Sequence, residues 1–480
     1  MNYDELLRLA APEAVLVGTA LVVLALGLSN QRASGLCSGV AAAGLLFAAS
    51  AVLMLPPQAV LFNGMLVITP LVALFKVISL ALAFFTVILA RQLKTRHHAE
   101  YLALLLLATV GIMLLVGSEE LLVIFIGLEL TGLSLYVMAA FDKSDRRSAE
   151  AGLKYFLFGS TASAFTLFGI SLIYGMTGTT SLAAIGGKLG AVTPLLAAGM
   201  VMTLIGFAFK IAAAPFHLWA PDTYQGAPAP SVAFIASASK VASFVVLGKI
   251  VLVGFAPAQG SAAWQAMVAG WAPLLAVLAA LSILIGNLVA LAQSNVRRLL
   301  AYSAVAHAGY TLLGLVAGGR DGFSATLFYT TTYAFTLVGA FGVVALVRRE
   351  TGGDDFSHFS GLRHRSPWLA ACMAVFMLSL AGIPPLAGFF GKFYLFSAAL
   401  RAGGNHGLLW LVALALFGSL ISFYYYLMVL KVIFVEKIDN VPPFTLDLLQ
   451  RTSIALLAAI VLFLGLFPGG LVWKISSSLP

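Results

Sequence analysis

Apolar runs of about 20 residues recur from one end of this 480-residue chain to the other. A run of that length, wound as an α-helix, crosses the hydrocarbon core of a bilayer. Only 9% of the residues are charged, whereas soluble domains carry about 25%. The stretches between the runs are too short for a soluble domain. The sequence therefore predicts an all-α polytopic membrane protein embedded in the lipid bilayer.

The runs predict about 14 transmembrane helices. The first run has neither the basic start nor the small-residue cleavage site of a signal peptide, so we expect it to be retained. The expected ranges are 12–30, 35–55, 68–90, 100–117, 119–141, 148–175, 194–214, 228–252, 270–291, 295–317, 322–348, 366–383 continuing to 402, 407–435 and 452–474.

Basic residues are distributed unequally between the loops at the two ends of these helices. The poorer set is Arg8, Lys188, Arg320, Arg401 and Lys474. The richer set is Arg32, Arg91, Lys94, Arg96, Lys143, Arg146, Arg147, Arg297, Arg298, Arg348, Arg349, Arg363, Arg365, Lys431, Lys437 and Arg451. Because cytoplasmic loops are enriched in Lys and Arg, the richer set predicts the cytoplasmic side. Both termini are then expected outside, on the periplasmic face of a bacterial plasma membrane.

The net charge of +9 is explained by these loops, so no nucleic-acid partner is predicted. The two cysteines, Cys37 and Cys372, are far apart and form no C-x-x-C motif. An iron–sulfur cluster needs four thiolates, and a haem electron carrier needs axial ligands such as histidine pairs across helices. Only His217 and His307 are expected within helices. We therefore predict no metal site and no cofactor on this chain.

Every basic residue inside a predicted helix is a lysine: Lys76, Lys154, Lys210, Lys240, Lys249 and Lys392. Arginine keeps its proton at any accessible pH, whereas the pKa of lysine falls readily on burial. A site that must bind and release a proton can therefore use lysine. The alternative is that the amines reach the membrane interface along their apolar stems, which fits Lys76, Lys154 and Lys249 near helix ends.

Glu129 lies in the middle of the apolar segment IGLELTGLSLYVMAAF. A charged group at the centre of a membrane helix costs about 2.5–3.5 kcal/mol on insertion scales, so it usually has a partner and a function. We interpret Glu129 as a functional carboxylate. A purely structural contact with a lysine or serine of a neighbouring helix is the alternative.

Two lysines lie beside predicted helix breaks. Lys210 precedes Pro215 in GFAFKIAAAPFHLWAPDTYQGAPAP, and Lys392 follows Gly382–Pro385 in LSLAGIPPLAGFFGKFYLF. Proline interrupts a helix, and a broken helix at membrane depth is tolerated only inside protein or beside a water-filled cavity. Breaks of this kind mark ion sites in transporters.

The two breaks also suggest an internal repeat. Residues 100–252 and 270–435 would each form a five-helix repeat with one broken helix, flanked by a three-helix segment at 1–99 and a C-terminal helix at 452–480. Five is an odd number of spans, so the second repeat would be inverted relative to the first.

Lys240 is surrounded in sequence by Ser237, Ser239 and Ser243. These small polar residues leave room for water along a proton path, or for close helix packing. Histidine can relay protons near neutral pH, so His307 and His217 are candidate supporting relay residues, together with Lys154. A satisfied polar contact at a packing seam is the alternative for His307. Asp222 is expected in a loop or helix cap, and the aromatic run Phe423–Tyr426 at the membrane interface.

These segments resemble the antiporter-like membrane subunits of respiratory complex I and of multisubunit cation/proton antiporters. The resemblance covers nearly the whole chain and rests on the Glu129 helix, the segment around Lys210, the YSAVAHAGY stretch and the AGIPPLAGFFGKF stretch. Within the family it is nearest to the N-type subunits, because a lysine stands at position 392, where the M-type has glutamate. The long C-terminal lateral helix of the L-type is also not expected.

The resemblance implies a function in proton translocation, with Glu129, Lys210, Lys240 and Lys392 as the family's channel glutamate and its broken-helix, connecting and distal lysines. It implies partners in the membrane arm of an NADH-quinone oxidoreductase, with NADH, FMN, iron–sulfur clusters and quinone on other subunits. The alternatives are a subunit of a cation/proton antiporter or of a membrane-bound hydrogenase, and a passive assembly subunit. The buried charges disfavour a passive subunit.

Overall fold

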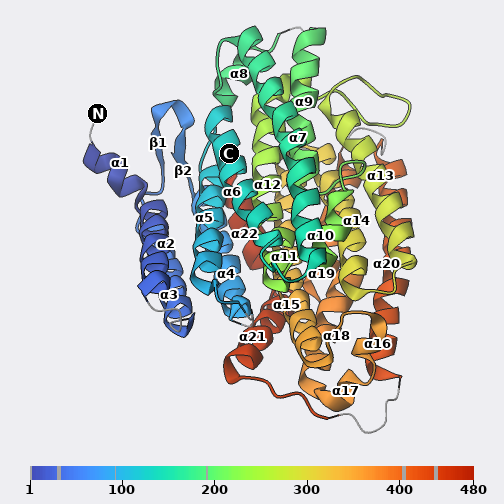
Figure 1. The fold of residues 1–480 in the computed structure, drawn as a ribbon. Helices are drawn as coiled ribbons and strands as arrows, with labels where there is room; N and C mark the ends of the chain where they lie inside the picture. Colours follow the sequence, from blue (N-terminus) through green and yellow to red (C-terminus); the bar gives the residue numbers. More distant parts are fainter. Residues whose placement is uncertain are drawn as a thin grey trace. The chain divides into compact units, whose positions relative to one another are not determined.

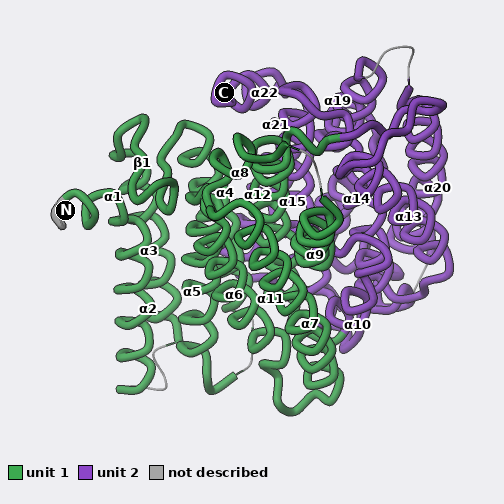
Figure 2. Tube along the Cα trace, turned by 90° about the horizontal axis from the view of Figure 1, so that it is seen from above, with its two compact units in different colours: residues 1–210, 226–259 green, residues 211–225, 260–480 purple. Residues whose placement is uncertain are grey.

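A computed structural model describes residues 3–29, 34–91, 93, 95–190, 193–402, 407–436 and 442–479. Arg32, Lys94 and Lys437, which contribute to the predicted topology, lie outside the described residues. The chain forms two compact units (Figure 2). Unit 1 contains residues 1–210 and 226–259, and unit 2 contains residues 211–225 and 260–480.

Unit 1 is built from helices and one small hairpin. Its helices are α1 (Tyr3–Leu9), α2 (Ala11–Ser29), α3 (Ser34–Leu53), α4 (Pro70–Ala90), α5 (His98–Val116), α6 (Leu121–Ala139), α7 (Arg146–Thr177), α8 (Leu182–Lys188), α9 (Pro194–Lys210), α11 (Ala229–Ala236) and α12 (Ala238–Lys249). A π-helical turn, Ile250–Gly254, continues α12. Strands β1 (Ala59–Leu61) and β2 (Leu66–Ile68) pair antiparallel, with Val60 opposite Val67.

Close backbone contacts hold the helices of unit 1 together, as for α7 and α9 (Figure 1). Gly169 of α7 and Gly199 of α9 face each other there. A Cβ on Gly169 would lie 2.6 Å from the carbonyl oxygen of Gly199, and one on Gly199 would lie 3.1 Å from that of Gly169. Small residues permit this approach of membrane helices, so two glycines fix the position of the helix that ends at Lys210.

Unit 2 contains most of α10 (Trp219–Gly226) and the helices that follow residue 260. They are α13 (Trp271–Leu291), α14 (Val296–Ala317), α15 (Gly319–Thr351), α16 (Phe356–Phe359), α17 (Leu362–Arg365), α18 (Pro367–Ala381), α19 (Ala387–Arg401), α20 (Leu409–Phe434), α21 (Leu448–Leu466) and α22 (Pro468–Ser478). In an apolar stretch of 18 residues in each of α14 and α15, 94% of the residues are buried. These two helices form the core of unit 2, and polar side chains on them need partners inside the protein.

The predicted set of spans is confirmed. In the described part of the chain, 12 helices are long and apolar enough to cross a membrane, and two shorter apolar helices, Pro194–Lys210 and Pro367–Ala381, precede breaks. Two expected helices are each divided in the structure. The range 452–474 is two helices, α21 and α22, because Pro468 starts a new helix after Phe467. The range 228–252 is divided into α11 and α12 at Ser237. The β1–β2 hairpin was not predicted. The division into inverted repeats stays a prediction.

Both predicted helix breaks are present. Helix α9 ends at Lys210, and helical structure resumes at Trp219. Helix α18 ends at Ala381, and α19 begins at Ala387. A third break separates α11 from α12 at Ser237, so Lys240 also lies within a turn of a helix start.

Candidate functional site

The side chain of Lys210 lies among aromatic rings inside unit 1. It is the last residue of α9, its side chain is buried, and in the described part of the chain its Nζ has no hydrogen-bond partner. The Nζ lies 5.5 Å from the ring centroid of Tyr136 and 5.8 Å from that of Tyr155. The faces of aromatic rings attract a cation. The two tyrosines therefore stabilise a charged amine that makes no hydrogen bond to any described residue.

Glu129 of α6 lies on the same small cavity as Lys210. The cavity has a volume of about 10 Å³ and is also lined by Tyr136 and Ser163, which is roughly the space that one water molecule needs. The hydroxyl of Ser163 donates a short hydrogen bond to the Glu129 carboxylate. The carboxylate also attracts the Lys210 amine electrostatically. The structure thus brings Glu129 and Lys210 together around room for one water.

Two glycines make space for this arrangement. A Cβ on Gly159 of α7 would overlap the hydroxyl of Tyr136. A Cβ on Gly132 of α6 would lie 3.1 Å from the same hydroxyl and 3.2 Å from the Nζ of Lys210. Tyr136 was not singled out from the sequence. It could have been identified, because it follows Glu129 by seven residues, which places both side chains on one helical face two turns apart.

Lys240 lies in the first turn of α12 and is 2% exposed. The hydroxyl of Ser237 donates to the carbonyl of Ala233 at 2.6 Å, and that of Ser243 donates to the carbonyl of Ser239 at 2.7 Å. The hydroxyls of Ser237 and Ser243 thus bond to carbonyls of the preceding turn. These local bonds satisfy them inside the span Ala229–Gly254, where 94% of an 18-residue apolar stretch is buried. A hydrated path beside Lys240 stays a prediction.

Lys392 of α19 lies inside unit 2 against the end of α18. Its Nζ donates hydrogen bonds to the carbonyl of Ala381 at 3.1 Å and to the hydroxyl of Ser419 at 2.9 Å. It also lies 5.3 Å from the ring centroid of Tyr310. A Cβ on Gly382 would lie 3.3 Å from the Nζ. Lys392 follows its break in sequence, but its amine folds back onto the half-helix before the break.

His307 of α14 is the centre of a polar network in unit 2. Its Nδ1 lies 2.5 Å from the hydroxyl of Tyr329, and its Nε2 lies 3.0 Å from the hydroxyl of Tyr426. Tyr426 also forms a short hydrogen bond with Ser303. Because a neutral imidazole donates at one nitrogen and accepts at the other, this chain of hydroxyl and imidazole groups is able to pass a proton.

The prediction that Phe423–Tyr426 forms an interfacial belt is wrong for half of the run. Tyr425 and Tyr426 are buried, with Tyr425 donating to Asn287 at 3.1 Å, whereas Phe423 and Tyr424 are exposed. Successive helical residues are rotated by about 100°, so four consecutive aromatic residues cannot share one face.

The remaining candidate relay residues lie in separate places. Lys154 pairs with Glu150 at 2.6 Å on the surface of α7. His217, in the non-helical stretch before α10, is buried, and its ring lies edge-on to Tyr302 at 6.4 Å. Asp222, expected in a loop or cap, lies in the first turn of α10 and pairs with Arg298 at 2.7 Å.

The interpretation of Lys76 and Lys249 as interface-seeking lysines is wrong. Lys76 is fully buried and pairs with Glu13 of α2 at 2.6 Å. Lys249 is 6% exposed and donates to the carbonyl of Val116 at 2.9 Å, with Glu119 at 3.6 Å. Both amines have anionic or carbonyl partners inside unit 1, which removes the need to reach the interface. The Glu13 partner is distant in sequence, so spacing alone did not reveal it.

Comparisons with known proteins identify relatives that match almost the whole chain. A subunit N 2 of NADH-quinone oxidoreductase from Acidobacterium capsulatum is 47% identical over 488 residues, with 98% of each chain covered. A chain in respiratory complex I from Thermus thermophilus with bound aureothin is 33% identical, with a TM-score of 0.82 and coverage of 98% of this chain and 100% of that one. A chain of the Mrp complex from a Dietzia species shares the fold, with a TM-score of 0.80 at 22% identity, covering 100% of this chain and 97% of that one.

The family model described as NADH:quinone oxidoreductase/Mrp antiporter, TM, matches residues 118–422. That range includes Glu129, Lys210, Lys240 and Lys392, and it spans both units of the chain. This multi-pass membrane chain therefore belongs to the family of antiporter-like transmembrane subunits of NADH:quinone oxidoreductases and Mrp antiporters.

Proposed function

We propose that this chain is the N-type membrane subunit of an NADH-quinone oxidoreductase and that it conducts protons through Glu129, Lys210, Lys240 and Lys392. The observation that carries the proposal is that Glu129 and Lys210 line one cavity of about 10 Å³ at the end of a broken helix. Two opposite charges with room for one water form a minimal unit for binding and releasing a proton.

In the proposed mechanism, a change in the charge on Glu129 changes the proton affinity of Lys210. A negative carboxylate favours the charged amine, so loss or movement of that charge favours release of the proton from Lys210. The released proton would pass to Lys240 and onward to Lys392. Moving one charge against 100 mV costs about 2.3 kcal/mol, and a change of about two pKa units corresponds to roughly 2.7 kcal/mol. A change of about two units in the pKa of Lys210 is therefore sufficient to move one proton against about 100 mV.

In unit 2, His307 and its tyrosine partners are placed to serve Lys392. The ring of Tyr310 lies 5.6 Å from that of His307 and 5.3 Å from the Nζ of Lys392. A second cavity of about 10 Å³ lies beside His307 and Tyr329. We assign His307 a supporting relay role, and Lys154 and His217 remain candidates for the same role.

The redox chemistry is assigned to partner subunits. NADH, FMN, iron–sulfur clusters and quinone would be bound there, and electron transfer would supply the driving free energy. The loop bases support a topology with both termini on the periplasmic side of a bacterial inner membrane. The name of the Acidobacterium relative and the 33% identity to a chain of complex I favour this assignment over an antiporter or hydrogenase subunit.

Replacing Lys210 with Ala in the whole complex tests the proposal. In membrane vesicles, NADH oxidation and acidification of the lumen are measured together. The Lys210→Ala complex should assemble but lose most proton translocation, because the amine that accepts the proton is absent. Lys188→Ala is the matched control, since Lys188 is exposed and its amine donates, among the described residues, to the carbonyl of Thr177 alone. Full pumping by the Lys210→Ala complex would refute the proposed role of Lys210.

A further inference from the structure

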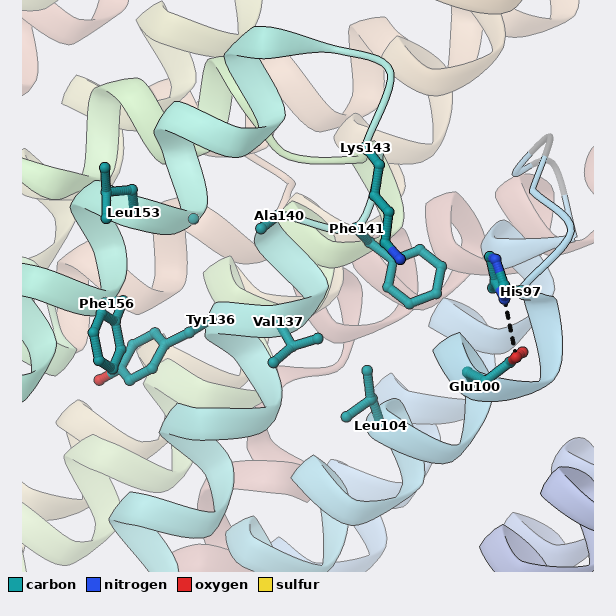
Figure 3. Close-up of a pocket in the computed structure, with 11 residues that line it drawn as sticks. His97, Glu100, Leu104, Tyr136, Val137, Ala140, Phe141, Lys143, Leu153 and Phe156 are labelled. Carbon is teal, nitrogen blue, oxygen red and sulfur yellow. Dashed lines mark hydrogen bonds and ion pairs between the residues drawn. The ribbon is translucent and has the colours of Figure 1, made fainter.

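An apolar groove with a charged rim opens on unit 1 between α5, α6 and α7 (Figure 3). Its volume is about 520 Å³, within the range of sites for small molecules. Its walls are formed mainly by large apolar and aromatic side chains: Leu104, Tyr136, Val137, Phe141, Leu153 and Phe156. Val137 is 51% exposed and Leu153 is 57% exposed. These side chains are therefore available to an apolar ligand.

The rim carries charges of both signs at one end of the groove. The Nδ1 of His97 lies 3.0 Å from the Oε1 of Glu100, and both side chains are largely exposed. Lys143 extends from the loop after α6 toward the ring of Phe141 and the His97–Glu100 pair (Figure 3). The rim lies where α5 begins and α6 ends, which is the depth of the membrane–water interface for helices that span the bilayer.

We propose that this groove binds one glycerophospholipid with a phosphoethanolamine headgroup. One of its acyl chains would lie against Val137, Leu153 and Phe156. The phosphate would contact Lys143, because a lysine ammonium binds phosphate as a point charge, and the headgroup ammonium would contact the carboxylate of Glu100. A cation and an anion side by side at the rim, above an apolar wall, match a zwitterionic amphiphile better than an anionic one.

The groove is also adjacent to the Glu129–Lys210 cavity. Tyr136 lines both spaces, so its ring is the wall between the groove and the Lys210 amine. An acyl chain in the groove would keep water away from the outer side of that ring. This sealing role rests on the function proposed above, whereas binding of the lipid does not.

Photocrosslinking in the whole complex tests the binding. The complex is reconstituted in nanodiscs that contain phosphatidylethanolamine with a diazirine in one acyl chain, and the crosslinked peptides are identified by mass spectrometry. Crosslinks are expected on the 136–141 and 152–156 segments. Val137→Trp should reduce them several-fold by filling the groove. Leu133→Trp is the matched control, because Leu133 is equally exposed, at 53%, one turn away on α6, and does not line the groove.

The headgroup assignment is tested with Lys143→Ala and Glu100→Gln. Both variants should lower crosslinking by the phosphatidylethanolamine probe, and Glu100→Gln should lower the preference over a phosphatidylglycerol probe. Leu153→Trp provides a second filled groove should the Val137→Trp complex fail to assemble. Lipid crosslinks that are equal in the filled and control variants, or that form only on a neighbouring protein chain, would overturn the proposal. None of these results depends on whether Lys210→Ala abolishes pumping.

Discussion

The ammonium of Lys392 donates a hydrogen bond to the carbonyl oxygen of Ala381, 3.1 Å away, and Ala381 is the last residue of α18. The C-terminal end of a helix carries a partial negative charge, which stabilises a nearby cation. Lys210 has no such acceptor in the described residues and is held instead over the rings of Tyr136 and Tyr155. Both amines lie near tyrosine rings, since Tyr310 is 5.3 Å from the Lys392 amine, but in the described residues only Lys392 also has a hydrogen bond to a helix end.

Lys392→Arg tests whether position 392 must titrate. Arginine can keep the contacts with Ala381 and Ser419, but it holds its proton at any accessible pH. We expect normal assembly with strongly reduced proton translocation in vesicles. Lys431→Arg, on the exposed end of α20, is the control for the substitution itself. Proton pumping at the wild-type rate in the Lys392→Arg complex would show that this amine need not release its proton.

Tyr136 is predicted to act through its ring rather than its hydroxyl. Tyr136→Phe keeps the aromatic face near Lys210, so most proton translocation should remain. Tyr136→Leu removes a cation–π contact worth about 0.5–2 kcal/mol, so the charged form of Lys210 becomes less stable. The pH at which pumping is half-maximal should therefore move to a lower value. The measurement is the pH profile of pumping in both variants. Equal loss in the Phe and Leu variants would assign the role to the hydroxyl.

Asp354 joins three residues of unit 2 in the loop before α16. Its carboxylate accepts hydrogen bonds from Asn295 at 2.7 Å, Arg348 at 2.9 Å and Arg297 at 3.3 Å. Arg297 is only 1% exposed. Removing one partner of a buried ion pair costs about 3–5 kcal/mol, so Asp354→Ala should lower the thermal stability of the complex markedly. Asp355→Ala is the neighbouring control: within the part of the chain that the structure describes, it loses a single side-chain hydrogen bond, from Asn295 at 2.8 Å.

The same carboxylate predicts an acid dependence. Burial raises the pKa of Asp354, but the two arginines and Asn295 lower it more, so the pKa lies below its ordinary value. A depressed pKa in the folded state stabilises the protein above the unfolded-state pKa of about 3.9. That stabilisation is lost as the pH falls through the folded-state value. Melting temperatures measured across acidic pH should show this loss in the wild type and a smaller one in Asp354→Ala.

The membrane helices and their breaks could be predicted from the sequence because both signals are local. A run of apolar residues identifies a span, and proline beside a lysine identifies an interrupted one. Glu129, Lys210, Lys240 and Lys392 were expected as groups inside the membrane from the same signals. The structure buries the three lysines and leaves Glu129 half-buried.

The partners of these groups could not be predicted because they depend on packing between distant segments. Tyr155 lies on α7, yet its ring faces Lys210 on α9. Tyr426 is 119 residues from His307. Periodicity places such residues on a helical face, but it does not say which face meets which helix. The hairpin β1–β2 has strands of three residues each, too short for an alternating pattern to stand out.

The buried pair Glu13–Lys76 also constrains how the protein is made. Its members are 63 residues apart, on α2 and α4, so the carboxylate leaves the ribosome well before the amine that neutralises it. A lone charge in hydrocarbon is costly. Pairing of Glu13, in the first turn of α2, with Lys76 is therefore possible only once α4 is present, and this pair then fixes the position of α2 relative to α4.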